Sequence, residues 1–115
     1  MKSDVGIVAN QERERAEPVN LEEKFHALAA QWKVDSLFMS SVTDMVTLSS
    51  YQAIIALGEQ AIPLLLGELA REPNHWFAAL TAITGEDPVR PEGRGNLDKM
   101  TEAWLRWGHE RGYRW

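Results

Sequence analysis

Cysteine is absent from this chain of 115 residues. Its absence excludes disulfide bonds, zinc sites made of thiolates and cysteine nucleophiles. Long apolar runs are also missing, because no stretch approaches the roughly 18 apolar residues of a membrane-spanning helix. Residues 1–18 lack the apolar centre of a secretory signal. Together these absences predict a cytoplasmic protein with no membrane segment.

The alternation of apolar and polar residues that marks a half-buried β-strand is missing as well. Apolar residues recur instead at helical spacing, most clearly at Leu21, Phe25, Leu28 and Trp32 and at Leu97, Met100, Trp104 and Trp107. Such stripes are typical of helices that bury one face. We therefore expect an all-α fold, a compact helical bundle of about five to six helices.

Capping residues predict where the helices begin and end. The side chains expected to cap helix starts are those of Asn20, Ser49, Asn74 and Asn96, and the glycines expected to end helices are Gly58, Gly85 and Gly112. A weaker helical stretch is expected to carry Leu37, Phe38, Val42, Met45 and Val46. The predicted core comprises Phe25, Leu28, Trp32, Leu57, Leu65, Leu69, Phe77, Leu80, Ile83 and Trp104.

The N-terminal residues differ in polarity from the rest of the chain. Residues 1–19 are polar and are expected to form a flexible arm before a single helical domain at residues 20–115. The net charge is −5, with the excess of acidic residues in the N-terminal part. General affinity for nucleic acid comes mostly from basic side chains on phosphates. An acidic chain therefore favours a basic or neutral protein partner.

One phrase of the sequence occurs nearly twice. The segment Ala53–Glu59 is echoed by Ala79–Glu86, and between them lies Ala61–Leu66, an apolar helix with Pro63 near its start. Residues 51–86 thereby resemble a short HEAT-like repeat. A wider stretch, carried by Ser40–Thr43, His75–Phe77 and Ala103–Gly108, is similar to a family of small uncharacterised bacterial proteins. The resemblance implies helix pairs that stack into a binding surface, and it implies no activity.

The C-terminus combines aromatic and basic side chains. The residues expected to contact a partner are Trp107, Arg111, Tyr113, Arg114 and Trp115. Aromatic residues mixed with arginine are enriched at protein-binding hot spots and on surfaces that stack single-stranded nucleic acid. Docking of a protein and packing within the molecule are both open interpretations of this C-terminus. A further alternative is a nucleic-acid-associated accessory subunit that uses it.

The loop before the last helix is a candidate anion site. It places Arg90, Arg94, Gly95 and Asn96 ahead of a helix N-terminus, where free amides and the helix dipole favour negative charge. The loop lacks the longer glycine pattern and the lysine of a nucleotide-binding loop. A structural connector is the alternative interpretation.

Reactive groups do not converge in the sequence. Glu72 and His75 have the spacing of half a di-metal site, but only one such pair occurs and Pro73 interrupts it. The serines lie in no recognisable nucleophile elbow. We therefore expect no metal, cofactor or catalytic residue.

The leading hypothesis from the sequence is a non-enzymatic protein-interaction adaptor or regulator. Such a protein would serve as a subunit of a larger bacterial complex or as an acidic, antitoxin-like inhibitor of a basic partner. The alternatives are the nucleic-acid-associated subunit and an enzyme without a recognisable motif. The sequence leaves the oligomeric state open.

Overall fold

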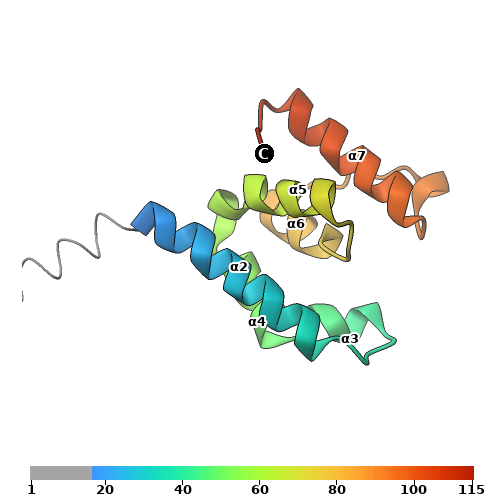
Figure 1. Ribbon diagram of the computed structural model, residues 1–115. Helices are drawn as coiled ribbons and strands as arrows, with labels where there is room; N and C mark the ends of the chain where they lie inside the picture. The colour runs from blue at the N-terminus through green and yellow to red at the C-terminus, as the bar shows by residue number, and fades with distance from the viewer. Residues whose placement is uncertain (1–16) are drawn as a thin grey trace, which may run out of the picture.

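The structure is a computed structural model that describes residues 17–115, with side chains from Leu21 onward. All regular secondary structure in this range is helical (Figure 1). Its six α-helices are α2 Glu17–Asp35, α3 Val42–Val46, α4 Ser49–Ala56, α5 Ile62–Arg71, α6 Phe77–Thr84 and α7 Leu97–Glu110. Two 3-10 turns, η1 Gly58–Ala61 and η2 Pro91–Gly93, precede α5 and α7. No β-strand occurs in the described range, and the predicted all-α bundle is confirmed.

Helix α2 begins earlier than the sequence predicts. It starts at Glu17, so Asn20 lies within the helix rather than at its N-cap. The predicted arm at residues 1–19 falls mostly outside the described residues, and its last three residues belong to α2.

The structure confirms the predicted positions of a glycine at one helix end and of a proline at one helix start. Gly85 has a φ of 73° and ends α6, as a left-handed glycine is expected to do. Pro63 lies in the first turn of α5, where its missing N–H breaks no helical hydrogen bond. The prediction that the Ser49 side chain caps a helix start is wrong, because Leu48 occupies the N-cap position of α4 and no side chain caps this helix. The side-chain amide of Gln52 donates to the Val46 carbonyl at 2.8 Å.

The helices lie in three groups. Figure 1 shows α2 and α4 side by side on one flank of α5 and α6, and α7 on the opposite flank of α5. The largest buried side chains come from all of these helices and from Trp76, directly before α6. The bundle is therefore held by one continuous core.

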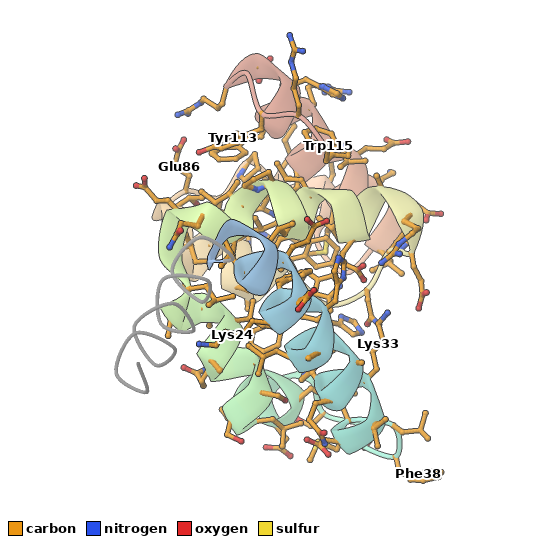
Figure 2. The ribbon with its side chains drawn as sticks, turned by 60° about the vertical axis from the view of Figure 1, so that its left-hand side comes forward. Lys24, Lys33, Phe38, Glu86, Tyr113 and Trp115 are labelled. Atoms are coloured by element: carbon orange, nitrogen blue, oxygen red, sulfur yellow. The ribbon has the colours of Figure 1, made fainter. Side chains whose placement is uncertain are left out.

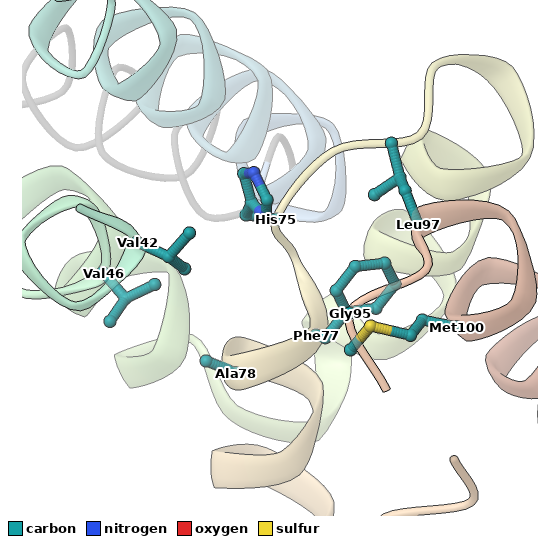
Figure 3. A pocket seen from close by; sticks show the side chains of 8 residues that line it. All are labelled: Val42, Val46, His75, Phe77, Ala78, Gly95, Leu97 and Met100. Carbon is teal, nitrogen blue, oxygen red and sulfur yellow. The ribbon is translucent and has the colours of Figure 1, made fainter. Parts of the chain in front are cut away.

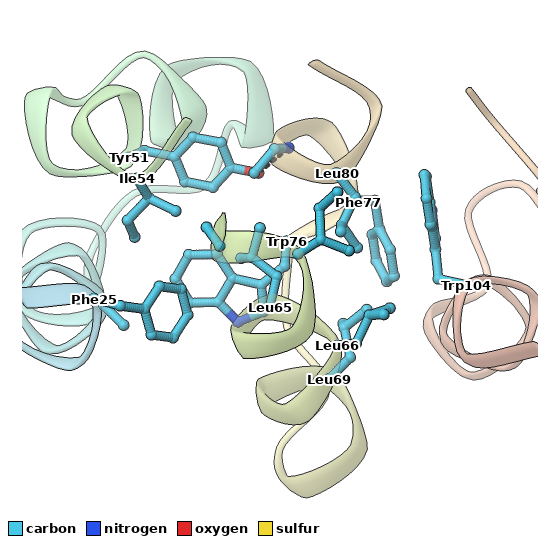
Figure 4. Packing of buried hydrophobic residues seen from close by; sticks show 14 of the residues in the cluster. Phe25, Tyr51, Ile54, Leu65, Leu66, Leu69, Trp76, Phe77, Leu80 and Trp104 are labelled. Atoms are coloured by element: carbon cyan, nitrogen blue, oxygen red, sulfur yellow. Dashed lines mark hydrogen bonds between the residues drawn. The ribbon is translucent and has the colours of Figure 1, made fainter. Parts of the chain in front are cut away.

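Trp76 lies at the centre of this core, although it is missing from the core predicted from the sequence. Its ring centroid is 4.5 Å from that of Trp32 and 5.8 Å from that of Tyr51, to which it is nearly parallel. On the far side, Trp104 reaches in from α7 toward Phe77 (Figure 4). Seven of the predicted core residues are buried, whereas Leu28, Leu57 and Ile83 are partly buried at the edge of the cluster.

One carboxylate is buried beside this apolar core. Glu68 is only 2% exposed, and its carboxylate pairs with Lys33 of α2 at 3.4 Å and with Arg71 on its own helix. The Lys33 ammonium also lies 3.5 Å from Glu72. A buried charge needs such partners, because leaving it unpaired is costly. The pair Lys33 and Glu68 therefore joins α2 to α5.

Candidate functional site

An apolar groove lies between α3 and α7 (Figure 3). Its cavity volume is about 340 Å³. We call it the α3–α7 groove, and it is lined by Val42, Val46, His75, Phe77, Ala78, Gly95, Leu97 and Met100. His75 is the only lining residue with a titratable side chain. With so few polar groups, the groove is better suited to apolar side chains than to the orientation of a polar substrate.

The two walls of the groove are helix starts, each set by a capping side chain. Ser41 precedes α3 and accepts a hydrogen bond from the Asp44 amide at 3.4 Å. Asn96 caps α7 by accepting from the Lys99 amide at 3.0 Å, as the sequence predicts. Val42 and Val46 are four residues apart and Leu97 and Met100 three apart, so each pair shares one helix face. The walls are therefore two short apolar stripes.

The floor of the groove is the N-terminal end of α6, which Tyr51 holds in place. The Tyr51 hydroxyl donates to the His75 carbonyl at 2.8 Å and accepts from the Ala79 amide at 2.9 Å. Burial raises the pKa of Tyr51, which keeps the hydroxyl protonated and able to donate. The prediction that Asn74 caps a helix over 75–83 is wrong. Its side chain accepts only from the neighbouring His75 amide, and Tyr51 satisfies the first turn of α6.

Exposed apolar side chains lie beside the groove. The predicted second helix forms only over α3, and the residues before it belong to the α2–α3 connection. There Phe38 is 96% exposed and Leu37 is 67% exposed, and Val34 at the end of α2 is 68% exposed. We call these three residues the apolar corner. Figure 2 shows Phe38 pointing away from the helices at this end of the molecule.

The apolar corner is close to the groove along the chain. Phe38 and Val42 are four positions apart, so their Cα atoms are at most about 14 Å apart. Val42 itself is 43% exposed at the groove entrance. The sequence pattern predicts that Phe38 and Val42 lie on one helix. The Ser- and Thr-rich composition around them was the signal that this helix would be short.

The C-terminal residues predicted to contact a partner fold back onto the protein. Trp107 is buried and stacks on Tyr113, with ring centroids 5.6 Å apart. The Trp115 ring packs on His109 at 4.3 Å, and 39% of its surface stays exposed. Figure 2 shows Tyr113 and Trp115 between α7 and α5. The part of this set that is exposed comprises Arg111, Arg114 and one side of Trp115.

Arg111 is held by a carboxylate that follows the end of α6. Its guanidinium pairs with Glu86 and lies 5.2 Å from the centre of the Trp107 ring. Glu86 also accepts from the Trp107 indole N–H at 3.3 Å. The predicted contacts Trp107, Arg111 and Tyr113 thus form one intramolecular cluster with Glu86. Their role in binding a partner stays a prediction.

The candidate anion loop uses most of its polar groups internally. The Arg94 guanidinium donates to Asp87 at 2.9 Å, and the Asn96 side chain caps α7. The amide of Gly93 donates to the Arg90 carbonyl, and that of Asn96 donates to the Gly93 carbonyl. The Arg90 side chain is exposed, but the first turn of α7 already carries the negative charge of Asp98. This arrangement weakens the electrostatic case for an anion at Arg90, Arg94, Gly95 and Asn96, which stays a prediction.

Glu72 and His75 serve different parts of the structure. Glu72 pairs with Lys33, whereas His75 lines the α3–α7 groove. Among the described residues, no three His, Asp or Glu side chains are arranged to hold a metal ion.

The comparisons give this chain no relative: no protein-family model, curated protein or solved structure matches it. Within the described range, no single helix has the length and apolar character needed to cross a bilayer. Ser49–Ala56 and Gly58–Arg71 reach that length and composition only as a pair, and they meet at a bend of 107°.

Proposed function

We propose that this protein is a non-enzymatic protein-interaction module, an adaptor or regulator that binds a partner through the α3–α7 groove. The observation that carries the proposal is an apolar groove of about 340 Å³ next to three largely exposed apolar side chains of the apolar corner. Exposed apolar side chains beside an apolar groove typically mark a site of interaction. The groove and the corner together offer a partner more apolar contact than the C-terminal tail does.

The resemblance of residues 51–86 to a short HEAT-like repeat is part of the same proposal. Helices α4, α5 and α6 fall within or overlap this range. Repeats of this type present surfaces to protein partners. The acidic balance of the chain, with a net charge of −5, supports a basic partner, as for an inhibitor or a subunit of a larger complex.

The proposal is tested by affinity purification from the protein's own host with a matched pair of variants. The groove variant is Val42→Ser/Leu97→Ser, which changes the first residues of α3 and α7. Both positions are at least 38% exposed, and serine is tolerated at a helix start. The control is Leu105→Ser, a partly buried residue on α7 that does not line the groove.

Quantitative mass spectrometry of the purified complexes is the measurement. We expect a partner that the wild-type protein and the Leu105→Ser control enrich equally and that the groove variant enriches at least about tenfold less. Each lost contact with a buried Val or Leu side chain is worth about 1.5–3 kcal/mol, enough for such a change. The proposal fails if the groove variant retains every partner of the wild-type protein, or if the wild type enriches none.

A further inference from the structure

The end of the molecule that carries the groove and the apolar corner is acidic. No Lys or Arg occurs in residues 34–70, which include the whole of α3 and α4. Asp35 ends α2 and Asp44 lies in α3, and both are exposed. The two carboxylates therefore flank the exposed apolar residues Leu37 and Phe38 along the chain.

Two further features keep this end negative. The C-terminal end of α2 points its last carbonyls toward the corner, and a helix of 19 residues adds the equivalent of about half a negative charge there. The nearest lysine, Lys33, is engaged with Glu68 and Glu72 on α5. Its positive charge is thus compensated within the fold.

The opposite wall of the groove adds little positive charge. Arg94, directly before Gly95, is paired with Asp87, and Asp98 stands beside Leu97 in the first turn of α7. Lys99 lines a different groove, on which Arg106, Glu102 and Glu110 also lie. The groove lining therefore contains no Lys or Arg, and the helices that form its two walls carry the exposed carboxylates of Asp44 and Asp98.

We infer that the occupant of the α3–α7 groove is a helical segment of a partner protein, apolar on one face and flanked by Lys or Arg. This inference rests on the proposed function and specifies the chemistry of its partner. The stripes Val42/Val46 and Leu97/Met100 lie on opposite walls with Phe77 and Ala78 between them, an arrangement that suits the apolar face of a helix (Figure 3).

Charge also decides between a foreign partner and a second copy of this chain. A second copy would bring a net charge of −5 against the same acidic end, and like charges oppose such an association. Basic flanks would instead pair with Asp35 and Asp44 while apolar side chains enter the groove. Attraction of this kind is screened by salt, with a Debye length of about 10 Å at 0.1 M.

The inference is tested with two fluorescein-labelled amphipathic helical peptides that have the same apolar face. One peptide carries three Lys at each end, and the other carries three Glu at each end. Fluorescence anisotropy with the full chain is read at low and high salt. We expect the Lys peptide to bind at least about tenfold more tightly at low salt, and this advantage to shrink at high salt. The variant Asp35→Asn/Asp44→Asn should weaken Lys-peptide binding about threefold or more. The control Glu102→Gln/Glu110→Gln, with the same change in charge, should not.

The outcomes separate this inference from the proposed function. If both peptides bind equally and the variant Val42→Ser/Leu97→Ser binds neither, the inference of a basic partner is wrong. The groove would still be a docking site, as the proposed function requires. No binding of either peptide, or binding that the groove variant leaves unchanged, would contradict the groove as a docking site and the proposed function with it. Sedimentation of the wild type as a dimer that the groove variant converts to a monomer would assign the groove to a second copy and overturn the inference.

Discussion

A single tyrosine hydroxyl organises the start of α6. Helix starts leave amides without partners inside the helix, and a side chain close in sequence usually satisfies one of them. Here Tyr51, 28 residues before Ala79, bonds the Ala79 amide and the His75 carbonyl. The floor of the α3–α7 groove therefore depends on a contact between α4 and α6.

We predict that Tyr51→Phe lowers the free energy of unfolding by about 1–3 kcal/mol. The substitution leaves the His75 carbonyl and the buried Ala79 amide without this partner, and unsatisfied buried groups carry a penalty of that size. Equilibrium unfolding in urea measures the change. Tyr113→Phe is the control, since this partly exposed ring contributes mainly by stacking on Trp107 and should change the stability little. A Tyr51→Phe protein as stable as the wild type would contradict the capping role.

At the scale of elements, α7 approaches α5 closely because Gly108 has no side chain. A Cβ atom at this position would lie 2.6 Å from the Leu66 Cδ1 atom and 2.9 Å from the Trp115 ring. The same absence of a side chain leaves room for the C-terminal tail to fold back over α7. The approach of α7 and the position of Trp115 are thus consequences of one residue.

We predict that Gly108→Ala destabilises the protein by about 1–3 kcal/mol through overpacking, although alanine by itself favours a helix. Gly67→Ala in α5 is the matched control, because its added Cβ would be 3.4 Å from the Trp115 Cβ, an ordinary contact. The control should be neutral or stabilising by up to about 1 kcal/mol. Urea unfolding of the two variants measures both effects, and equal stabilisation by both would show that α7 is not tightly seated.

The C-terminal tail gives a second prediction at this scale. Deletion of Tyr113–Trp115 removes the ring stacked on Trp107 and the ring packed on His109. We expect the free energy of unfolding to fall by about 2 kcal/mol, because each of these partly buried aromatic rings contributes packing in addition to its contact area. The thermal midpoint, measured by circular dichroism, should fall by on the order of 10 °C. An unchanged midpoint would instead support a docking role for the tail, one of the interpretations that the sequence leaves open.

At the scale of the whole molecule, one core receives buried side chains from every described α-helix except α3, whose Met45 and Val46 pack at its edge. Its buried side chains run from Phe25 in α2 through Leu65 in α5 to Trp104 in α7. The apolar corner stands apart from this core, with Phe38 almost fully exposed. The apolar corner, which we propose contacts a partner, is therefore separate from the residues that stabilise the fold.

We predict a single cooperative unfolding transition that Leu65→Ala shifts by about 2–5 kcal/mol, as expected for a fully buried leucine. Phe38→Ala is the contrasting variant and should stay within about 0.5 kcal/mol of the wild type, because its side chain is exposed. Denaturant unfolding followed by tryptophan fluorescence and by circular dichroism tests both expectations. Two separate transitions, or a large effect of Phe38→Ala, would contradict this division of roles.

The sequence by itself determined the features that depend on neighbouring residues. The helical period of Phe25 and Trp32, the Asn96 cap and the glycine at the end of α6 act over one or two turns, so the pattern of the chain reports them directly. The all-α class and most of the core follow from these local signals. The candidate site was less predictable, because Val42 and Leu97 become one groove only after α3 and α7 are brought together.

Only the tertiary structure decided which side chain satisfies which group at long range. Tyr51 replaced Asn74 as the partner of the first turn of α6, and Glu68 became buried because Lys33 of α2 reaches it. Trp115, which the sequence predicts at a partner-binding surface, packs against Gly108. These outcomes depend on the distance between segments far apart in the chain. Local periodicity carries no information about that distance.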